Sequence, residues 1–199
     1  MGRHLMTQSL LSSWLYLYRA YEGYEAAAYA DFLDTLNRVE KPSNEAMRAG
    51  IELEDAINAV LSGKLEPSKT SESVRYIAEI VRGGQPQVAL YKDKYISGMN
   101  FLLYGRLDYL KAGTIYDVKF SGKYEVGKYL SSVQHPFYFE LCPEAVWFEY
   151  LISDGRDVFS ERYTRAETEP VDKTIRYFIE FLKARGLLDI YFEKWKAND

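Results

Sequence analysis

The stretch from residue 107 to residue 119, LDYLKAGTIYDVK, contains both the turn and the residue alternation that decide the fold. Ala112-Gly113 separates two runs of apolar and aromatic residues, a pattern that predicts a β-hairpin. A two-residue loop and a four-residue loop both give the same register, with Asp108 directly opposite Asp117. The stretch therefore predicts two antiparallel strands that carry a facing pair of carboxylates.

Strand alternation extends this pair to a cluster of three charged side chains. Successive side chains of a strand point to opposite faces, so Asp117 and Lys119 share one face. The other face carries apolar residues and is expected to face the core; it holds Tyr116, Val118 and Phe120. Cross-strand partners share a face, so Asp108 joins Asp117 and Lys119.

Two carboxylates placed opposite each other on a sheet, about 5 Å apart at their β-carbons, destabilise it by repulsion. A divalent cation bound by both relieves the repulsion, because Lys119 alone neutralises only one of the two charges. The alternative is a lysine that bridges two surface aspartates on an exposed sheet. The geometry of the hairpin leaves both interpretations open.

A third acid comes from an expected helix at residues 45–61. On a helical wheel, Glu54 lies near the middle of an apolar stripe, while Glu52 and Asp55 point away toward solvent. The stripe consists of Met47, Gly50, Ile51, Glu54, Ile57 and Leu61. An acid inside such a stripe is unfavourable unless it is paired or binds metal. A glutamate at the edge of the stripe that extends to water is the alternative.

The pattern along the whole chain predicts an α/β or α+β fold in one domain, residues 1–199. Residues 1–5 precede a second methionine, are interpreted as an expression scar and are given no weight. Helices are expected at residues 9–20, with Ser9 as N-cap, and at 25–39, 45–61, 71–81, 132–141 and 171–185, the last with Gly186 at its C-terminus. Strands are expected at residues 88–91, 95–98, 101–110, 115–120, 145–152 and 158–163.

Composition narrows the class of site. A single cysteine, Cys142, excludes a disulfide within the chain and an iron–sulfur cluster, and it fits a reducing, cytoplasmic location. Two histidines are too few for a histidine-rich metal site, so any metal site is built from carboxylates and suits Mg²⁺ or Mn²⁺. No apolar run is long enough to span a bilayer, so no membrane partner is expected. The net charge of -4 argues against a protein that coats nucleic acid nonspecifically.

The cluster resembles the site of the PD-(D/E)xK nuclease superfamily. Asp108 is followed nine positions later by Asp117-Val118-Lys119, which matches the D…DxK pattern, although Leu107 stands where the pattern has proline. RAGIELE at residues 48–54 looks like the helical acid motif of lambda-type phage exonucleases, in which a glycine lies four residues before the metal-binding acid.

Two further segments agree with this resemblance. Gln134 to Tyr138 is similar to the QxxxY motif of RecB-type nucleases, and the two side chains share a helix face at i and i+4. Pro136 inside this motif is a departure, tolerated only in the first helical turn after a cap at Ser131 or Ser132. SLLSSW at residues 9–14 looks like the opening helix of the family.

The resemblance implies a restriction-endonuclease-like core, with a central mixed β-sheet flanked by helices. It also implies that Glu54, Asp108, Asp117 and the backbone carbonyl of Val118 hold Mg²⁺ or Mn²⁺, with Lys119 as the fourth catalytic residue. Gln134 and Tyr138 would position the substrate, although Tyr138 fits a helix packed on the sheet equally well. Alternation on the strand adds Arg106 as a phosphate contact or as a structural ion-pair partner of Asp108.

The function that the resemblance implies is a metal-dependent DNA nuclease, with an exonuclease of phage or mobile-element recombination and end processing preferred. A structure- or sequence-specific endonuclease on the same core is the alternative enzyme. A catalytically inert nucleic-acid-binding module is the alternative from another class, and the complete acid–acid–lysine set argues against it. DNA is the expected partner, and a homo-oligomer or a recombination partner protein stays open.

Overall fold

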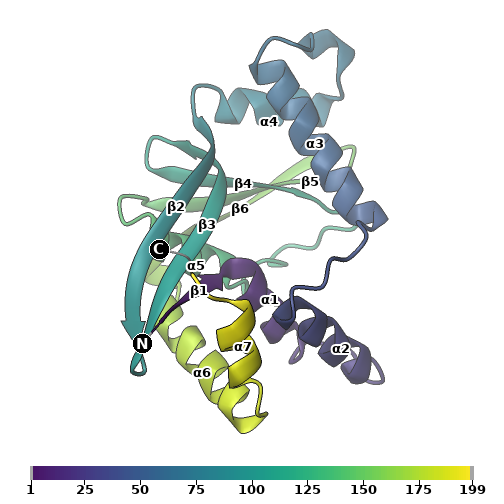
Figure 1. Cartoon of the computed structure of the whole chain (residues 1–199). Helices are drawn as coiled ribbons and strands as arrows, with labels where there is room; N and C mark the ends of the chain where they lie inside the picture. Colours follow the sequence, from purple (N-terminus) through teal and green to yellow (C-terminus); the bar gives the residue numbers. More distant parts are fainter. Residues whose placement is uncertain (1, 198–199) are drawn as a thin grey trace.

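A computed structural model describes residues 2–197 of the chain. A six-stranded mixed sheet in this part of the chain has helices on both faces (Figure 1). The strands are β1 (Arg3–Thr7), β2 (Gln85–Ile96), β3 (Met99–Lys111), β4 (Thr114–Phe120), β5 (Trp147–Ser153) and β6 (Val158–Thr164). The helices are α1 (Gln8–Tyr16), α2 (Glu25–Leu36), α3 (Glu45–Leu61), α4 (Glu72–Val81), α5 (Gln134–Leu141), α6 (Val171–Ala184) and α7 (Leu188–Lys194), with 3₁₀ turns at Pro67–Lys69 and Arg165–Glu167. The expected central mixed sheet flanked by helices is confirmed.

Strand β3 organises the sheet because three other strands pair with it. Strand β2 runs antiparallel along nearly its whole length. On the opposite edge, β1 pairs parallel with the first half of β3, and β4 pairs antiparallel with its last residues. Strand β5 then pairs parallel with β4, and β6 pairs antiparallel with β5. The parallel and antiparallel pairs make the sheet mixed.

Two apolar cores lie on opposite faces of the sheet. Alternate residues of β5 divide between them: Ile152 packs in the core that includes α1, α5 and α6, whereas Leu151 packs with α3 and α4. On β3, Leu107 belongs to the first core and Tyr109 to the second. Asp108 therefore lies between the two cores.

Three expectations about the elements were wrong. Residues 3–5, given no weight, belong to β1 and pair with β3, in a contact between distant segments that no local pattern signals. The two strands expected at 88–91 and 95–98 are the single strand β2, since the polar run between them is an exposed part of an edge strand paired with β3. The first helix is capped by Thr7, whose Oγ1 accepts from the N–H of Leu10 at 3.3 Å, rather than by Ser9.

Two helices are shorter than expected: α1 ends at Tyr16 rather than at residue 20, and α2 ends at Leu36 rather than at residue 39. Other boundaries agree more closely. Helix α3 begins at Glu45 and ends at Leu61 as expected, and Gly186 follows α6 with a φ of 66°. Helix α7 was not among the expected helices. None of the described helices is both long and apolar enough to cross a membrane.

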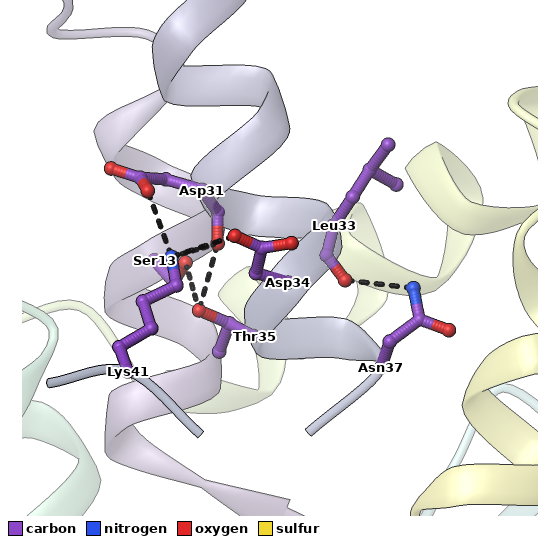
Figure 2. Close-up of polar contacts among 7 residues, drawn as sticks. All are labelled: Ser13, Asp31, Leu33, Asp34, Thr35, Asn37 and Lys41. Carbon is purple, nitrogen blue, oxygen red and sulfur yellow. Dashed lines mark hydrogen bonds and ion pairs between the residues drawn. The ribbon is translucent and has the colours of Figure 1, made fainter. Parts of the chain in front are cut away.

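The linker between α2 and α3 is fastened to α2 by one lysine. Lys41 Nζ contacts Oδ1 of Asp31 at 2.8 Å and Oδ2 of Asp34 at 3.4 Å (Figure 2). Thr35 Oγ1 donates to the carbonyl of Asp31 at 3.0 Å and lies 3.1 Å from Oγ of Ser13 on α1. These contacts fix where the linker leaves α2 on its way to α3, the helix that carries Glu54.

Candidate active site

The hairpin has the predicted register. Leu110 pairs with Ile115 and Tyr109 with Tyr116, and the two turn residues, Ala112 and Gly113, have φ values of 48° and 76°. Positive φ at both central residues is the conformation of a type I′ hairpin turn. The regular ladder stops at Tyr109, so the next residue of β3 is Asp108.

Beyond the end of the backbone ladder, the side chain of Asp108 continues the hydrogen bonding between β3 and β4. Its Oδ2 accepts a hydrogen bond from the backbone N–H of Val118 at 2.8 Å. In an extended strand the N–H and C=O of one residue point to the same edge, so the Val118 carbonyl faces the Asp108 side of β4 as well. The carboxylate and the carbonyl named as metal ligands thus lie along the same edge.

A gap in the sheet exposes this edge. The pairing of β1 with β3 ends at Thr7 and Tyr104, and that of β4 with β3 begins at Tyr116 and Tyr109. Between these points, residues 105–108 of β3 have no ladder partner on that side. The candidate site lies in this gap.

Asp117 is nearly inaccessible, with 4% of its surface exposed, because α5 covers its face of the sheet. Gln134 of α5 donates through Nε2 to Oδ1 of Asp117. Lys119 Nζ lies 2.6 Å from Oδ2 of Asp117, although no hydrogen-bond donor among the described residues is well aligned with that oxygen. Pro136 falls in the first turn of α5, where it is tolerated, and Ser132 Oγ accepts from the N–H of Gln134 at 3.1 Å.

The charges of the cluster act on one another. Burial raises the pKa of Asp108 to about 8, with a further contribution from the negative charges of Asp117 and Glu54. Burial also raises the pKa of Asp117, although the Lys119 ammonium opposes the rise. For Lys119, burial disfavours the charge, but attraction to Asp117 and Asp108 prevails and raises its pKa. The metal-free cluster therefore holds its protons more tightly than isolated side chains do.

Glu54 is close enough to the cluster for the charge of Asp117 to affect its pKa, but it does not lie where the helical wheel placed it. The buried face of α3 consists of Leu53, Ile57 and Val60, whereas Met47 and Ile51 are 53% and 54% exposed. The expected stripe was therefore wrong in its first half, since that half of α3 extends beyond the sheet. Glu54 is half-buried beside the true apolar face, and burial together with Asp117 raises its pKa.

Arg106 and Tyr138 meet at the backbone of β3. The Tyr138 hydroxyl donates to the carbonyl oxygen of Arg106 at 3.0 Å, and its ring packs directly against Gly105. Tyr138 is thus 7% exposed and is tied to the sheet. The Arg106 side chain is exposed and makes no hydrogen bond or ion pair within residues 2–197, so the structural pair with Asp108 does not form.

A cleft of about 430 Å³ opens onto the gap. Residues 7–9 at the start of α1 and residues 104–106 of β3 form its walls, together with Glu54, Asp108 and Tyr138. The volume lies within the ~300–1,000 Å³ of typical small-molecule sites. Two of the proposed catalytic carboxylates, Glu54 and Asp108, are therefore accessible to a ligand in this cleft.

The donor set suits a hard divalent ion, since it consists of carboxylates and a backbone carbonyl. The buried Oδ2 of Asp117 without an aligned hydrogen-bond donor, and the like charges around Asp108, also fit a cation at this place. As the side chains stand, no three acidic, histidine or cysteine side chains in the described part of the chain converge closely enough to share one ion. Glu54 and Asp108 would have to close toward Asp117 on binding.

Glu161 of β6 is a polar residue that the sequence did not single out. It is 8% exposed, and its carboxylate accepts from the N–H groups of Gly127 and Tyr129 at 2.9 and 3.2 Å and from the hydroxyls of Tyr124 and Tyr163. These bonds fix the segment between β4 and α5, which joins Lys119 to Gln134. A lone acid in an edge strand carries no sequence signal for this role.

Comparisons with known proteins identify solved structures that resemble this chain. No protein-family model matches the chain, and no curated protein matches it. The crystal structure of SSO0001 is similar with a TM-score of 0.53 and 14% identity, covering 93% of this chain and 78% of that chain. LHK-Exo in complex with dAMP has a TM-score of 0.47 and 19% identity, covering 95% of this chain and 91% of that chain. At such identities the likeness to SSO0001 concerns the fold alone.

Proposed function

We propose that this chain is a divalent-metal-dependent DNA nuclease. The observation that supports the proposal is the meeting of Asp108, Asp117 and Lys119 at a gap in the sheet, with Glu54 on the wall of the same cleft. Perturbed carboxylates that gather in a cleft are a frequent property of catalytic sites. Fold alone does not determine function, so the proposal rests on these residues and on the motifs that they match.

Glu54, Asp108, Asp117 and the Val118 carbonyl would hold Mg²⁺ or Mn²⁺. A bound divalent ion supplies Lewis-acid stabilisation of the phosphate and lowers the pKa of a coordinated water. Closing onto the ion would remove the repulsion that burial and like charge impose on Asp108. The binding of metal and the loss of protons from the carboxyl groups would therefore be linked.

Lys119 fits the role of an electrostatic and orienting group better than that of a base. Its raised pKa keeps it an ammonium near neutral pH, held 2.6 Å from Asp117. An ammonium beside the reacting phosphate stabilises the negative charge that develops in the transition state. The unpaired, exposed Arg106 on the cleft wall would contact a phosphate oxygen, and Gln134 would hold Asp117 in orientation.

The direct test is digestion of DNA in Mg²⁺ or Mn²⁺ by the parent and by Asp117→Ala and Lys119→Ala. Glu54→Ala should lose activity as well, whereas Glu52→Ala, an exposed glutamate two residues away on α3, should not. Cleavage that persists in both Asp117→Ala and Lys119→Ala would exclude these residues as the catalytic centre.

The digestion assay also distinguishes an exonuclease from an endonuclease. A linear substrate labelled at one end, compared with a closed circular substrate, distinguishes the preferred exonuclease, which spares the circle, from an endonuclease, which cuts it. Calorimetric titration with Mn²⁺ tests the metal independently of cleavage. Absence of Mn²⁺ binding together with retained DNA binding would replace the proposal with an inert binding module.

A further inference from the structure

Two tyrosines stack on the sheet beside the cleft. Tyr91 of β2 and Tyr104 of β3 are cross-strand partners, with ring centroids 4.9 Å apart and ring planes at 30°. Tyr91 is 63% exposed. A cross-strand aromatic pair stabilises a sheet even where it has no functional role. A role in ligand binding must therefore be argued from where the pair lies relative to the cleft.

Tyr104 lies between Tyr91 and the cleft. On one edge of β3 its partner is Tyr91, and on the other edge its partner is Thr7 of β1. Tyr104 and Thr7 both line the cleft, so the tyrosine borders the space where the carboxylates are accessible. Tyr91 supports the ring from the side away from the cleft.

The residues that follow along β3 place three kinds of group in a row. Side chains two apart share a face of a strand and are about 7 Å apart, so Tyr104 and Arg106 are neighbours on the cleft wall. Asp108, the next residue of this series, lies at the gap in the sheet and lines the same cleft. The row presents an aromatic ring, then an unpaired cation, then a carboxylate of the proposed centre. A nucleotide presents a base and then a phosphate over a similar length.

We propose that Tyr104, supported by Tyr91, stacks on an unpaired base of the DNA strand whose phosphodiester is cleaved, while Arg106 contacts a phosphate. The substrate class is then single-stranded DNA or a frayed end, because a base inside a duplex has both faces covered by its neighbours. Base stacking on aromatic side chains is tolerant of sequence. This inference rests on the proposed nuclease function and names the substrate of that same site.

The test is a double-mutant cycle between the tyrosine and the base. Binding is measured by fluorescence anisotropy with Mg²⁺ in the Lys119→Ala background, which suppresses cleavage. The probes are a single-stranded oligonucleotide with ordinary terminal nucleotides, the same strand with abasic ones, and a blunt duplex.

Tyr104→Ala is expected to weaken binding of the ordinary strand by about 5- to 150-fold, the range for the loss of one stacked base. The abasic strand should bind the parent more weakly by a similar factor and should be insensitive to Tyr104→Ala. This insensitivity also shows that the variant is folded. Tyr104→Phe should keep the affinity. Tyr95→Ala, which removes a 71% exposed tyrosine from β2, the strand that carries Tyr91, should have no effect.

Equal losses on the ordinary and abasic strands, or no loss on either, would overturn the stacking proposal and leave Tyr91 and Tyr104 a structural pair. Metal-dependent cleavage by the parent in that case would keep the nuclease proposal intact. A parent chain that neither binds nor cleaves DNA would overturn both.

Discussion

Gln134 on α5 donates a hydrogen bond through Nε2 to Oδ1 of Asp117 on β4. The bond links the helix after the DxK strand to the acid of that strand and leaves the second oxygen of Asp117 to Lys119. Gln134 is 7% exposed, so it supports the carboxylate from within the protein rather than from the cleft. The order of the QxxxY and DxK motifs along the chain thus corresponds to a direct contact in space.

Replacing Gln134 should disturb catalysis more than folding. Gln134→Ala is expected to lower Mg²⁺-dependent cleavage by about 10- to 100-fold, the usual effect of removing a group that orients a metal ligand. The measurement is initial rate against Mg²⁺ concentration, where the half-saturating concentration should rise. Gln85→Ala at the exposed start of β2 is the matched control. Unchanged metal dependence in Gln134→Ala would show that the bond does not orient Asp117.

Asp108→Asn should abolish cleavage and yet stabilise the metal-free protein. The raised folded pKa of about 8 means that ionisation of Asp108 opposes folding, so parent stability is lost as pH rises toward and through 8. The asparagine variant is expected to be more stable than the parent at pH 8.5 and to differ little from it at pH 4. Urea unfolding at both pH values in EDTA measures the difference.

Added Mg²⁺ gives the control for this prediction. The ion should stabilise the parent at pH 8.5, since a ligand of the folded state shifts the unfolding equilibrium, and should have little effect on Asp108→Asn. Asp55→Asn, an exposed change on α3, should alter neither series. A variant that is less stable than the parent at pH 8.5 in EDTA would contradict the repulsion inferred for Asp108.

Gly105→Ala should destabilise the protein because α5 approaches β3 at that residue without room for a side chain. An added Cβ would overlap the Tyr138 ring and lie 2.8 Å from Cδ1 of Leu141. The expected loss is about 1–3 kcal/mol, seen as a lower Tm. Gly122→Ala is the control, since no atom lies within 4 Å of its added Cβ. Equal Tm values for the two variants would show that α5 can move away without loss.

His135 should make stability depend on pH between about 6.5 and 4. Burial lowers the pKa of His135 to about 4, and its Nδ1 lies 3.1 Å from the Tyr150 hydroxyl. The depressed pKa contributes stability above the unfolded value of about 6.5, and this contribution, at most about 3 kcal/mol, is lost as pH falls toward 4. In urea unfolding, His135→Gln should make the free energy of unfolding depend less on pH in this range. His4→Gln should change that pH dependence less. Parallel curves for parent and His135→Gln would contradict the prediction.

Local chemistry accounts for what could be predicted about the hairpin. The Ala112-Gly113 turn and the two-residue alternation determine which residues pair, so Asp108, Asp117 and Lys119 could be grouped without coordinates. The position of Glu54 could be predicted only in part, because a helical wheel assumes that the whole helix packs on the core. Helix α3 extends past the sheet, and its first half is exposed at Met47 and Ile51.

The sequence alone determined the register of the hairpin, the extent of α3 and the shared face of Asp117 and Lys119, since these depend on neighbours a few residues apart. Only the tertiary structure decided that β1 pairs with β3, that a gap between β1 and β4 exposes the site, and that Glu161 fixes the segment before α5. Such contacts join residues far apart in the chain, and their stability comes from burial and hydrogen bonding that no local pattern encodes.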